Sequence, residues 1–232
     1  MFIWGHRGCR GIDGIDENTM PAFAWAVEHG CHGLEFDVQV SVDGVPFVFH
    51  DRTLERLTDG RDLREVQCLT WHDISEVSLT NGGRVPALSE LIVFGQSVVM
   101  NLEVKSFEAA GPVTEFIYKH GLSDWIVSSF INEALIHVRT ALPDQSIGYL
   151  LECVANETVL ACGDRARIQI DRLKPERIHL DDSLVSTSVG AWLRQSDYPI
   201  HVWTVNREDR GRGLEAEGIV GLFSDDVRLF VK

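Results

Sequence analysis

Residues 2–40, FIWGHRGCRGIDGIDENTMPAFAWAVEHGCHGLEFDVQV, decide the fold because they contain one complete strand–helix–strand unit. Phe2–Gly5 is a short apolar run of the kind that forms a buried strand. In Met20–His29 the apolar residues recur at helical spacing, and Thr19 stands where a helix N-cap is expected. Gly33–Val40 then predicts a second strand. A strand, a helix and a further strand in this order are typical of a parallel α/β fold.

The same alternation continues almost to the end of the chain. Strand-like runs follow at Val98–Val104, Trp125–Ser129, Ser146–Leu151, Arg177–Leu180, Ile200–Val205 and Ile219–Phe223, and helix-like stretches at Glu108–His120, Asn132–Leu142, Thr187–Gln195 and Arg207–Glu217. About eight β/α repeats predict a single (β/α)8 TIM barrel. A doubly wound sheet is the alternative, but no G-x-G-x-x-G follows the first strand. No linker rich in proline, glycine or serine interrupts the chain, so residues 1–232 are expected to form one domain.

A short hairpin is expected directly after the second strand. The chain there reads VQVSVDGVPFVFHD, and Asp43-Gly44 between alternating segments is a strong turn signal. If these two residues form the loop, Val42 opposes Val45, and counting back places Asp37 opposite His50. Opposed residues share one face of a hairpin. We therefore expect a β-hairpin insertion after strand 2 that brings His50 close to Asp37.

The composition excludes several classes of function. The formal net charge is -14, and no lysine and arginine cluster is dense enough for a nucleic-acid-binding patch. No run of about 18 apolar residues predicts a transmembrane helix, and no amphipathic segment predicts stable membrane association. No basic segment followed by an apolar stretch opens the sequence, so a cytoplasmic location is expected. The five cysteines are widely spaced without C-x-x-C and are expected to be free thiols.

Acidic residues alternate on two of the predicted strands. In GLEFDVQV, Glu35 and Asp37 are two residues apart and therefore face the same side of the strand. In NLEVK, Glu103 and Lys105 share a face in the same way. Carboxylates facing a barrel interior repel one another, and a divalent cation such as Mg²⁺ or Ca²⁺ would resolve that conflict. A solvated cluster of ion pairs is the alternative. Because strand C-termini of a barrel converge on one mouth, His6-Arg7 is expected to join this cluster.

In these features the sequence resembles the glycerophosphodiester phosphodiesterases, which belong to the phospholipase C-like phosphodiesterase superfamily. The motifs that carry the resemblance are His6-Arg7-Gly8, Glu17-Asn18-Thr19, Glu35-Phe36-Asp37, Asp43-Gly44 followed by His50-Asp51, Glu103-Val104-Lys105 and Trp203-Thr204-Val205-Asn206. Each motif alone is weak, but together they span the chain in the family's order. One departure is Ser224-Asp225-Asp226-Val227, which stands where the family usually has a T-D-x-P-like turn. This difference leaves the substrate preference more open than the chemistry.

The resemblance implies a metal-dependent hydrolase of glycerol and lipid metabolism that cleaves glycerophosphodiesters to glycerol 3-phosphate and an alcohol. By position, Glu35, Asp37 and Glu103 would hold one divalent cation, which is Mg²⁺, Ca²⁺ or Mn²⁺. His6 and His50 would form an acid–base pair, since one histidine can withdraw a proton while the other delivers one. The sequence leaves open whether water attacks directly or a substrate hydroxyl first forms a cyclic phosphate.

The resemblance also assigns roles around this centre. Arg7 would bind the phosphate, and Lys105 would offset charge that develops in the transition state. Trp203, at the end of the seventh strand, would form an apolar wall of the pocket, with core packing as the alternative. Glu17 and Asn18 would either contact substrate or the metal shell, or order the loop before the first helix.

Two other functions stay open at this point. The same machinery could act on lysophospholipids, as a phospholipase D-like enzyme, or on sugar phosphodiesters. A non-catalytic metal-binding barrel is less consistent with the sequence, because both motif histidines and all three acids are present. The expected partner is a small-molecule glycerophosphodiester. The sequence indicates neither the leaving alcohol nor an oligomeric state.

Overall fold

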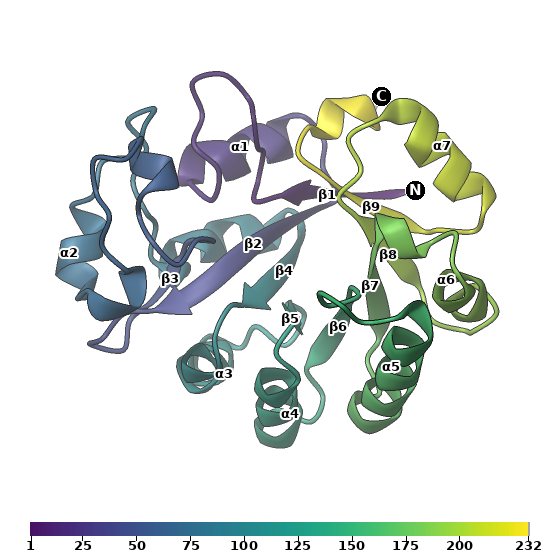
Figure 1. Ribbon diagram of the computed structural model, residues 1–232. Helices are drawn as coiled ribbons and strands as arrows, with labels where there is room; N and C mark the ends of the chain where they lie inside the picture. The colour runs from purple at the N-terminus through teal and green to yellow at the C-terminus, as the bar shows by residue number, and fades with distance from the viewer. Residues whose placement is uncertain (232) are drawn as a thin grey trace.

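The computed structural model describes residues 1–231 and has a closed barrel of parallel strands at its centre (Figure 1). The strands and helices in chain order are β1 (Phe2–His6), α1 (Met20–Glu28), β2 (Gly33–Val40), β3 (Pro46–Val48), α2 (Trp71–Ser75), β4 (Val99–Val104), α3 (Phe107–His120), β5 (Ile126–Ser129), α4 (Asn132–Ala141), β6 (Ser146–Leu151), α5 (Val159–Leu173), β7 (Arg177–Asp181), α6 (Ser188–Leu193), β8 (Ile200–Trp203), α7 (Glu208–Ala216) and β9 (Gly221–Ser224).

The sheet closes through its first and last barrel strands. Its order is β1-β9-β8-β7-β6-β5-β4-β2-β3, and a further pairing joins β1 to β2. Among the strands of residues 1–231, β3 pairs with β2 alone and in antiparallel direction, so it lies outside the ring that the other eight strands form. The predicted α/β TIM barrel with a hairpin after its second strand is therefore confirmed. Within the described residues, none of the helices has the length and apolarity needed to cross a membrane.

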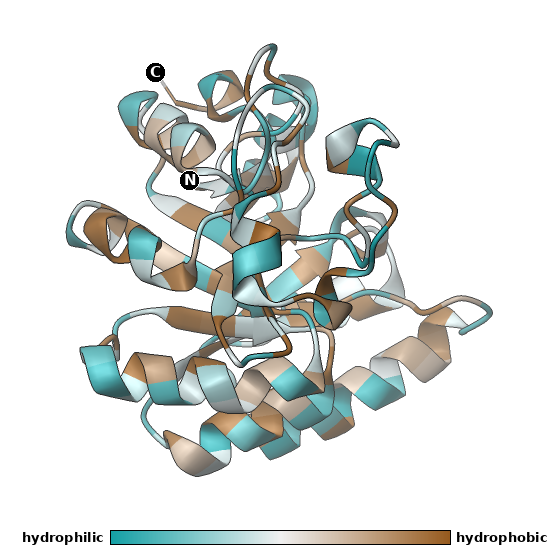
Figure 2. Cartoon of the chain, turned by 90° about the vertical axis from the view of Figure 1, so that its left-hand side faces the viewer, coloured by the Kyte–Doolittle hydropathy of each residue, from teal (hydrophilic) through white to brown (hydrophobic). Residues whose placement is uncertain are grey.

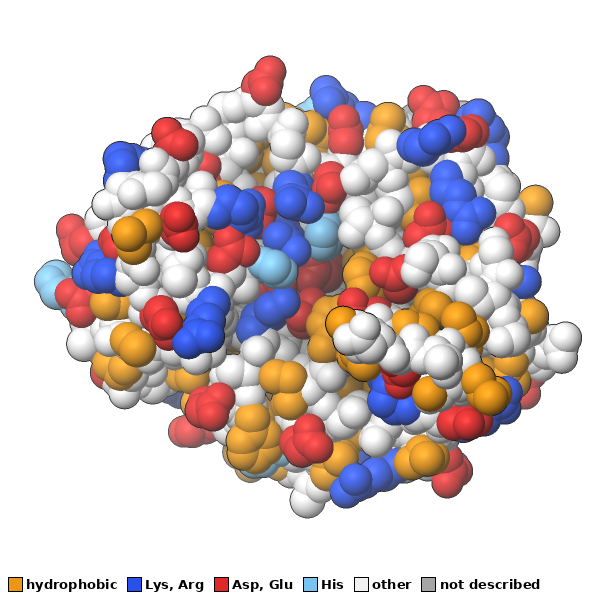
Figure 3. All heavy atoms as spheres, viewed as in Figure 1, with side chains coloured by type: hydrophobic (Ala, Val, Ile, Leu, Met, Phe, Trp, Pro, Cys, Tyr) orange, Lys and Arg blue, Asp and Glu red, His pale blue; other side chains and the backbone are white. Residues whose placement is uncertain are grey.

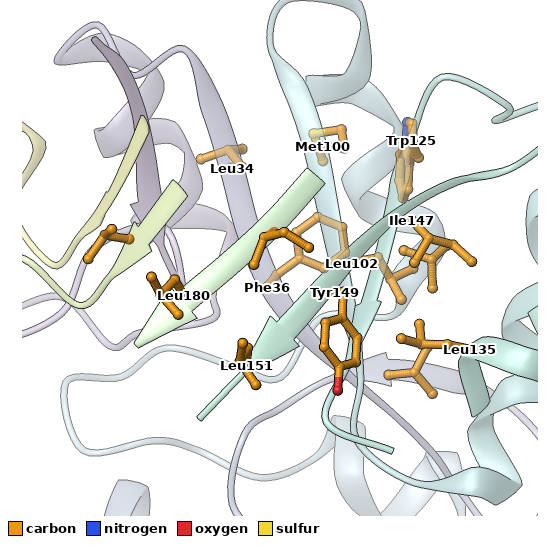
Figure 4. Close-up of a cluster of buried hydrophobic side chains, with 14 of the residues drawn as sticks. Leu34, Phe36, Met100, Leu102, Trp125, Leu135, Ile147, Tyr149, Leu151 and Leu180 are labelled. Atoms are coloured by element: carbon orange, nitrogen blue, oxygen red, sulfur yellow. The ribbon is translucent and has the colours of Figure 1, made fainter. Parts of the chain in front are cut away.

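The main core lies between the barrel and the surrounding helices. Leu34 and Phe36 of β2 point outward into it and are fully buried, together with Met100 and Leu102 of β4 (Figure 4). The helices present one apolar face to these strands, and Figure 2 shows hydrophobic and hydrophilic patches alternating along them. Because side chains alternate along a strand, the residues between these apolar ones point into the barrel.

The first helix begins as the sequence predicts. The Thr19 hydroxyl accepts a hydrogen bond from the backbone N–H of Ala22 at 3.4 Å, which caps α1. Helix α5 (Val159–Leu173), by contrast, is absent from the predicted elements. Its buried face consists largely of small residues, whereas the large apolar residues Leu160 and Ile168 are exposed. Apolar residues on both faces of a helix obscure its periodic signal.

The hairpin differs from the prediction by one residue. Its loop is Val42-Asp43-Gly44, and the last of these residues is a glycine with φ of 82°. A three-residue loop that ends in the left-handed region is a common alternative to the two-residue turn. The extra residue moves the register, so the Phe49 N–H donates to the Asp37 carbonyl at 2.9 Å. The predicted pairing of Asp37 with His50 is therefore wrong, and His50 follows one residue after this hydrogen bond.

The hairpin and α2 lie beside the barrel (Figure 1), and a small apolar cluster packs between them. It contains Phe47, Phe49, Leu54, Leu57, Val66, Leu69, Ile74, Val77, Leu79 and Val85. This cluster anchors both sides of the segment that carries His50 and Asp51. The hairpin insertion therefore holds these two residues at the barrel mouth.

The barrel interior below the mouth is filled by aromatic residues. Trp4 stacks on Phe223 with ring centroids 5.4 Å apart. The indole N–H of Trp4 donates to Nδ1 of His201 at 2.8 Å, and His179 lies beside this pair. Glycine stands opposite each of these histidines, since a Cβ at Gly148 or Gly221 would collide with the ring of His179 or His201, respectively. Both histidines are buried in the barrel interior.

Candidate active site

Three carboxylates meet at the barrel mouth, as the strand pattern predicts. Parallel register places Glu35 of β2 beside His6 of β1, and Asp37 beside Glu103 of β4. The side chains of Glu35, Asp37 and Glu103 are buried, and each offers an oxygen within 4.8 Å of the other two. Carboxylates at this separation in a dry site repel one another strongly unless cations lie between them.

The cations of the chain offset this repulsion only in part. Lys105 places its Nζ 2.6 Å from Glu103 and 3.2 Å from Asp37. Burial would raise the pKa of Asp37, but the charges of Lys105 and Arg7 outweigh it and lower that pKa. Burial and the two neighbouring carboxylates hold the pKa of Glu35 well above its ordinary value. The positive charges of Lys105 and Arg7 therefore compensate Asp37 more than they compensate Glu35.

His6 is held by a carboxylate from the other end of the chain. Its Nδ1 lies 2.6 Å from Oδ1 of Asp225, in the turn that follows β9. Burial would raise the pKa of Asp225, but hydrogen bonds from His6 and Asn206 lower it. An ionised carboxylate can only accept, so Nδ1 of His6 carries the proton. Its other ring nitrogen, Nε2, lies 4.0 Å from Oε2 of Glu35 and therefore faces the three carboxylates.

His50 is held in the same way by its sequence neighbour. Its Nδ1 lies 2.6 Å from Oδ1 of Asp51, which also accepts hydrogen bonds from Arg56. Burial would raise the pKa of Asp51, but the hydrogen bonds from His50 and Arg56 outweigh it and lower that pKa. The Nε2 of His50 is therefore the unprotonated nitrogen when the ring is neutral. His50 lies near enough to the acids to lower the pKa of Asp37 through its charge.

The loop after β1 supplies Arg7 and its partners. The Arg7 side chain donates to Glu17 at 2.7 Å and places its Nε 3.3 Å from Asp37. Asn18 donates to Asp37 at 2.8 Å. Burial would raise the pKa of Glu17, but hydrogen bonds from Arg56 and Arg7 lower it. Glu17 and Asn18 thus order Arg7 and Asp37.

A cavity of about 280 Å³ opens over these groups. In Figure 3 histidine, basic and acidic side chains gather in a central hollow, and hydrophobic side chains border it on the right. Among the predicted site residues, the cavity is lined by His6, Arg7, Glu35, His50, Glu103, Lys105 and Trp203. Asp37, Glu17 and Asn18 lie behind that surface and contact the lining residues. Trp203 is fixed by its indole N–H, which donates to the His179 carbonyl at 3.0 Å.

Several residues of the pocket were not predicted. Asp51 follows His50 in an H-D dipeptide, and Asp225 lies in the turn that departs from the family pattern, so the sequence contains a signal at both positions. Arg56 carried none, because its contacts with Asp51 and Glu17 depend on the folded hairpin. Phe130 and Glu152 line the cavity directly after β5 and β6, where barrel enzymes place functional groups.

A parallel barrel with ionisable side chains gathered at the carboxyl ends of its strands is the architecture of a TIM-barrel enzyme. The family model described as the glycerophosphoryl diester phosphodiesterase family matches residues 6–229. The chain belongs to this family, and the expectation of a phosphoric diester hydrolase is confirmed.

Relatives of similar length support this assignment. A glycerophosphodiester phosphodiesterase of Caldanaerobacter subterraneus subsp. tengcongensis is 29% identical over 241 residues, which cover 97% of this chain and 94% of the relative. The crystal structure of such an enzyme from Thermotoga maritima is 30% identical, with a TM-score of 0.78 over 99% of this chain and 96% of that one. An Oleispira antarctica phosphodiesterase in complex with the product sn-glycerol-3-phosphate shares the fold, with 24% identity, a TM-score of 0.82 and coverage of 97% and 93%.

Proposed function

We propose that this chain hydrolyses glycerophosphodiesters to glycerol 3-phosphate and an alcohol, with one divalent cation and two histidines. One observation carries the proposal. His6 and His50 line the same cavity as the buried carboxylates, and each ring has its Nδ1 bound to its own aspartate. Two imidazoles with free Nε2 atoms over an acidic cluster suit the transfer of one proton in and another out.

The residues present fit a divalent cation. Glu35, Asp37 and Glu103 supply only oxygen atoms, which favours Mg²⁺, Ca²⁺ or Mn²⁺ over softer ions. Among residues 1–231, Glu35 has no close ion pair apart from His6 at 4.0 Å. When bound, such an ion would polarise a phosphoryl oxygen and lower the pKa of the attacking oxygen. The three carboxylates are proposed to hold it.

The histidines are proposed to exchange protons with the substrate through Nε2. Asp225 and Asp51 keep the proton of each neutral ring on Nδ1, so Nε2 is free to accept one. One ring takes the proton of the attacking oxygen, from water or from a substrate hydroxyl, and the other, charged, ring gives a proton to the leaving oxygen. The aspartates also stabilise each ring while it is charged.

The remaining residues bind and orient. Arg7 lines the cavity, and one of its terminal nitrogens donates a hydrogen bond to Glu17. The N–H groups that remain free are proposed to bind the phosphate. Lys105 is proposed to offset negative charge on the phosphoryl group in the transition state. Trp203, fixed by its hydrogen bond to the His179 carbonyl, is proposed to be an apolar wall. We further infer that residues 1–232 form a single domain and that the enzyme is cytoplasmic.

A substrate panel with several metals tests this proposal. The protein, stripped of metal and then given Mg²⁺, Ca²⁺ or Mn²⁺, is assayed on glycerophosphodiesters, lysophospholipids and sugar phosphodiesters. We expect glycerol 3-phosphate as the product from glycerophosphodiesters. The His50→Ala variant should lose most of this turnover, whereas Glu115→Gln, an exposed change on α3, should not. Hydrolysis restricted to lysophospholipids, or none with any metal, would contradict the proposal.

A further inference from the structure

Two of the five cysteines lie together beside one wall of the cavity. Cys153 is in the loop that follows β6, and Cys162 is in the first turn of α5. Their sulfur atoms and a carboxylate oxygen of Glu157 all lie within 4.8 Å of one another, and both cysteines are free thiols. Glu152, which precedes Cys153, lines the cavity. The proposed chemistry makes no use of this dithiol.

A guanidinium already supplies the positive charge of this cluster. Arg165 donates to the Glu157 carboxylate at 2.8 and 3.0 Å and to the backbone carbonyl of Glu152 at 2.7 Å. One of its nitrogens, Nη2, also lies 3.8 Å from Sγ of Cys162. A metal ion bound to both sulfurs and Glu157 would stand close to this guanidinium and be repelled by its charge. The arrangement therefore favours chemistry between the two thiols over metal binding.

The two thiols differ in access to solvent. Cys162 is buried in the core, and its thiol donates to the Glu152 carbonyl at 3.5 Å. Burial and the neighbouring Cys153 raise the pKa of Cys162 to about 12, while the charge of Arg165 acts in the opposite direction and favours its thiolate. Cys153 is only partly buried. A dissolved reactant therefore meets Cys153 first, and Cys162 is the second thiol that waits behind it.

We infer that Cys153 and Cys162 are a site of reversible disulfide formation, with a low-molecular-weight disulfide such as oxidised glutathione as the reactant. The Cys153 thiolate attacks one sulfur of the small disulfide, whose S–S bond breaks and releases one small thiol. Cys162 then attacks the Cys153 sulfur of the mixed disulfide, and the second small thiol leaves. The protein gives up two electrons and two protons, and both end in the two small thiols.

Closing this bond requires a small movement of the loop between β6 and α5. The two sulfurs lie within 4.8 Å and must approach to about 2 Å. The loop makes local hydrogen bonds, in which the Glu157 N–H donates to the Val154 carbonyl at 3.0 Å and the Val154 N–H donates to the Glu157 carboxylate at 3.1 Å. The Val154 side chain is exposed, so this turn can shift without disturbing the core. The disulfide would tether the loop next to Glu152 to α5.

The experiment equilibrates the native protein with about 0.1 mM reduced and about 0.1 mM oxidised glutathione, alkylates the remaining thiols and maps the peptides by mass. Exposed Cys68 is the control within the same chain, since it can form only the mixed disulfide. An effective concentration of about 1 mM for the paired thiols makes the ratio of disulfide to dithiol about tenfold higher than the ratio of mixed disulfide to thiol at Cys68. Trypsin releases residues 140–165 with both cysteines, and cleavage after Glu157 separates them unless the disulfide joins the two pieces.

Two variants and one metal analysis complete the test. In Cys153→Ser, buried Cys162 should stay reduced, whereas in Cys68→Ser the disulfide should form as in the wild type. Adding dithiothreitol should restore both thiols. A ratio no higher than that at Cys68, or a disulfide that joins either cysteine to a different one, would overturn the inference. One zinc ion retained by the purified protein and protecting both thiols from alkylation would assign the pair to a metal and also overturn it. The measurement needs no substrate, so its result is independent of the proposed function.

Discussion

Acidification should destabilise the protein through His201, which lies inside the barrel. This side chain is 4% exposed. Burial, with a smaller contribution from the charge of Arg177, lowers its pKa from 6.5 to about 3. The folded state therefore resists protonation that the unfolded chain accepts freely. Its Nδ1 also accepts the indole N–H of Trp4, and a proton on that nitrogen would set two donors against each other.

The magnitude follows from proton linkage. Because the folded pKa of His201 is depressed, the unfolded state binds more protons below 6.5, and stability falls as the pH decreases from there toward about 3. Each pH unit in this window costs about 1.4 kcal/mol. At a pH of about 5 the loss is about 2 kcal/mol, a substantial part of the 5–15 kcal/mol that stabilises a typical domain.

The assay is a comparison of unfolding free energies for the wild type and His201→Gln. The glutamine carbonyl can still accept from Trp4, but it does not titrate. Urea unfolding is followed by tryptophan fluorescence at a pH of about 7.5 and of about 5. The other ionisable groups are common to both proteins and cancel to first order. The wild type should lose about 2 kcal/mol more than the variant between the two conditions. Equal losses would refute the reasoning.

Three further predictions concern the pocket. Removal of metal by dialysis against EDTA should abolish turnover, and Mg²⁺, Ca²⁺ or Mn²⁺ should restore it; full activity in metal-free protein would end the idea of a cation site. His6→Ala and His50→Ala should each lower kcat by about 10²–10⁴-fold, while their affinity for the metal stays near normal. The double variant should be only slightly less active than the less active single variant. Near-normal turnover of His50→Ala would show that this histidine lies beside the site without taking part in catalysis. Asp225→Asn should lower kcat and alter the pH–rate profile with little change in KM, because the aspartate acts through His6; a change confined to KM would instead indicate a direct contact with substrate.

Local patterns predicted the centre of the site but not its surroundings. Glu35 and Asp37 follow from the two-residue period of a strand, and that period holds whatever the rest of the chain does. The position of His50 depended on loop length. One additional loop residue, Val42, moved the register, although the histidine still reaches the cavity. The pairing of His6 with Asp225 spans 219 positions of sequence and exists only because β1 lies beside β9.

That pairing of the first and last barrel strands has a consequence for biosynthesis. His6 and the carboxylates of β2 and β4 leave the ribosome before the later strands, whereas β9 (Gly221–Ser224) and Asp225 follow all the other barrel strands. Until β9 docks, the edges of β1 and β8 that it will cover are unpaired, and the His6 ring has no carboxylate to hold it. A nascent chain therefore carries most of the proposed catalytic groups without the arrangement that would let them work. Activity should start only when β9 pairs with β1, which makes it a reporter of barrel closure.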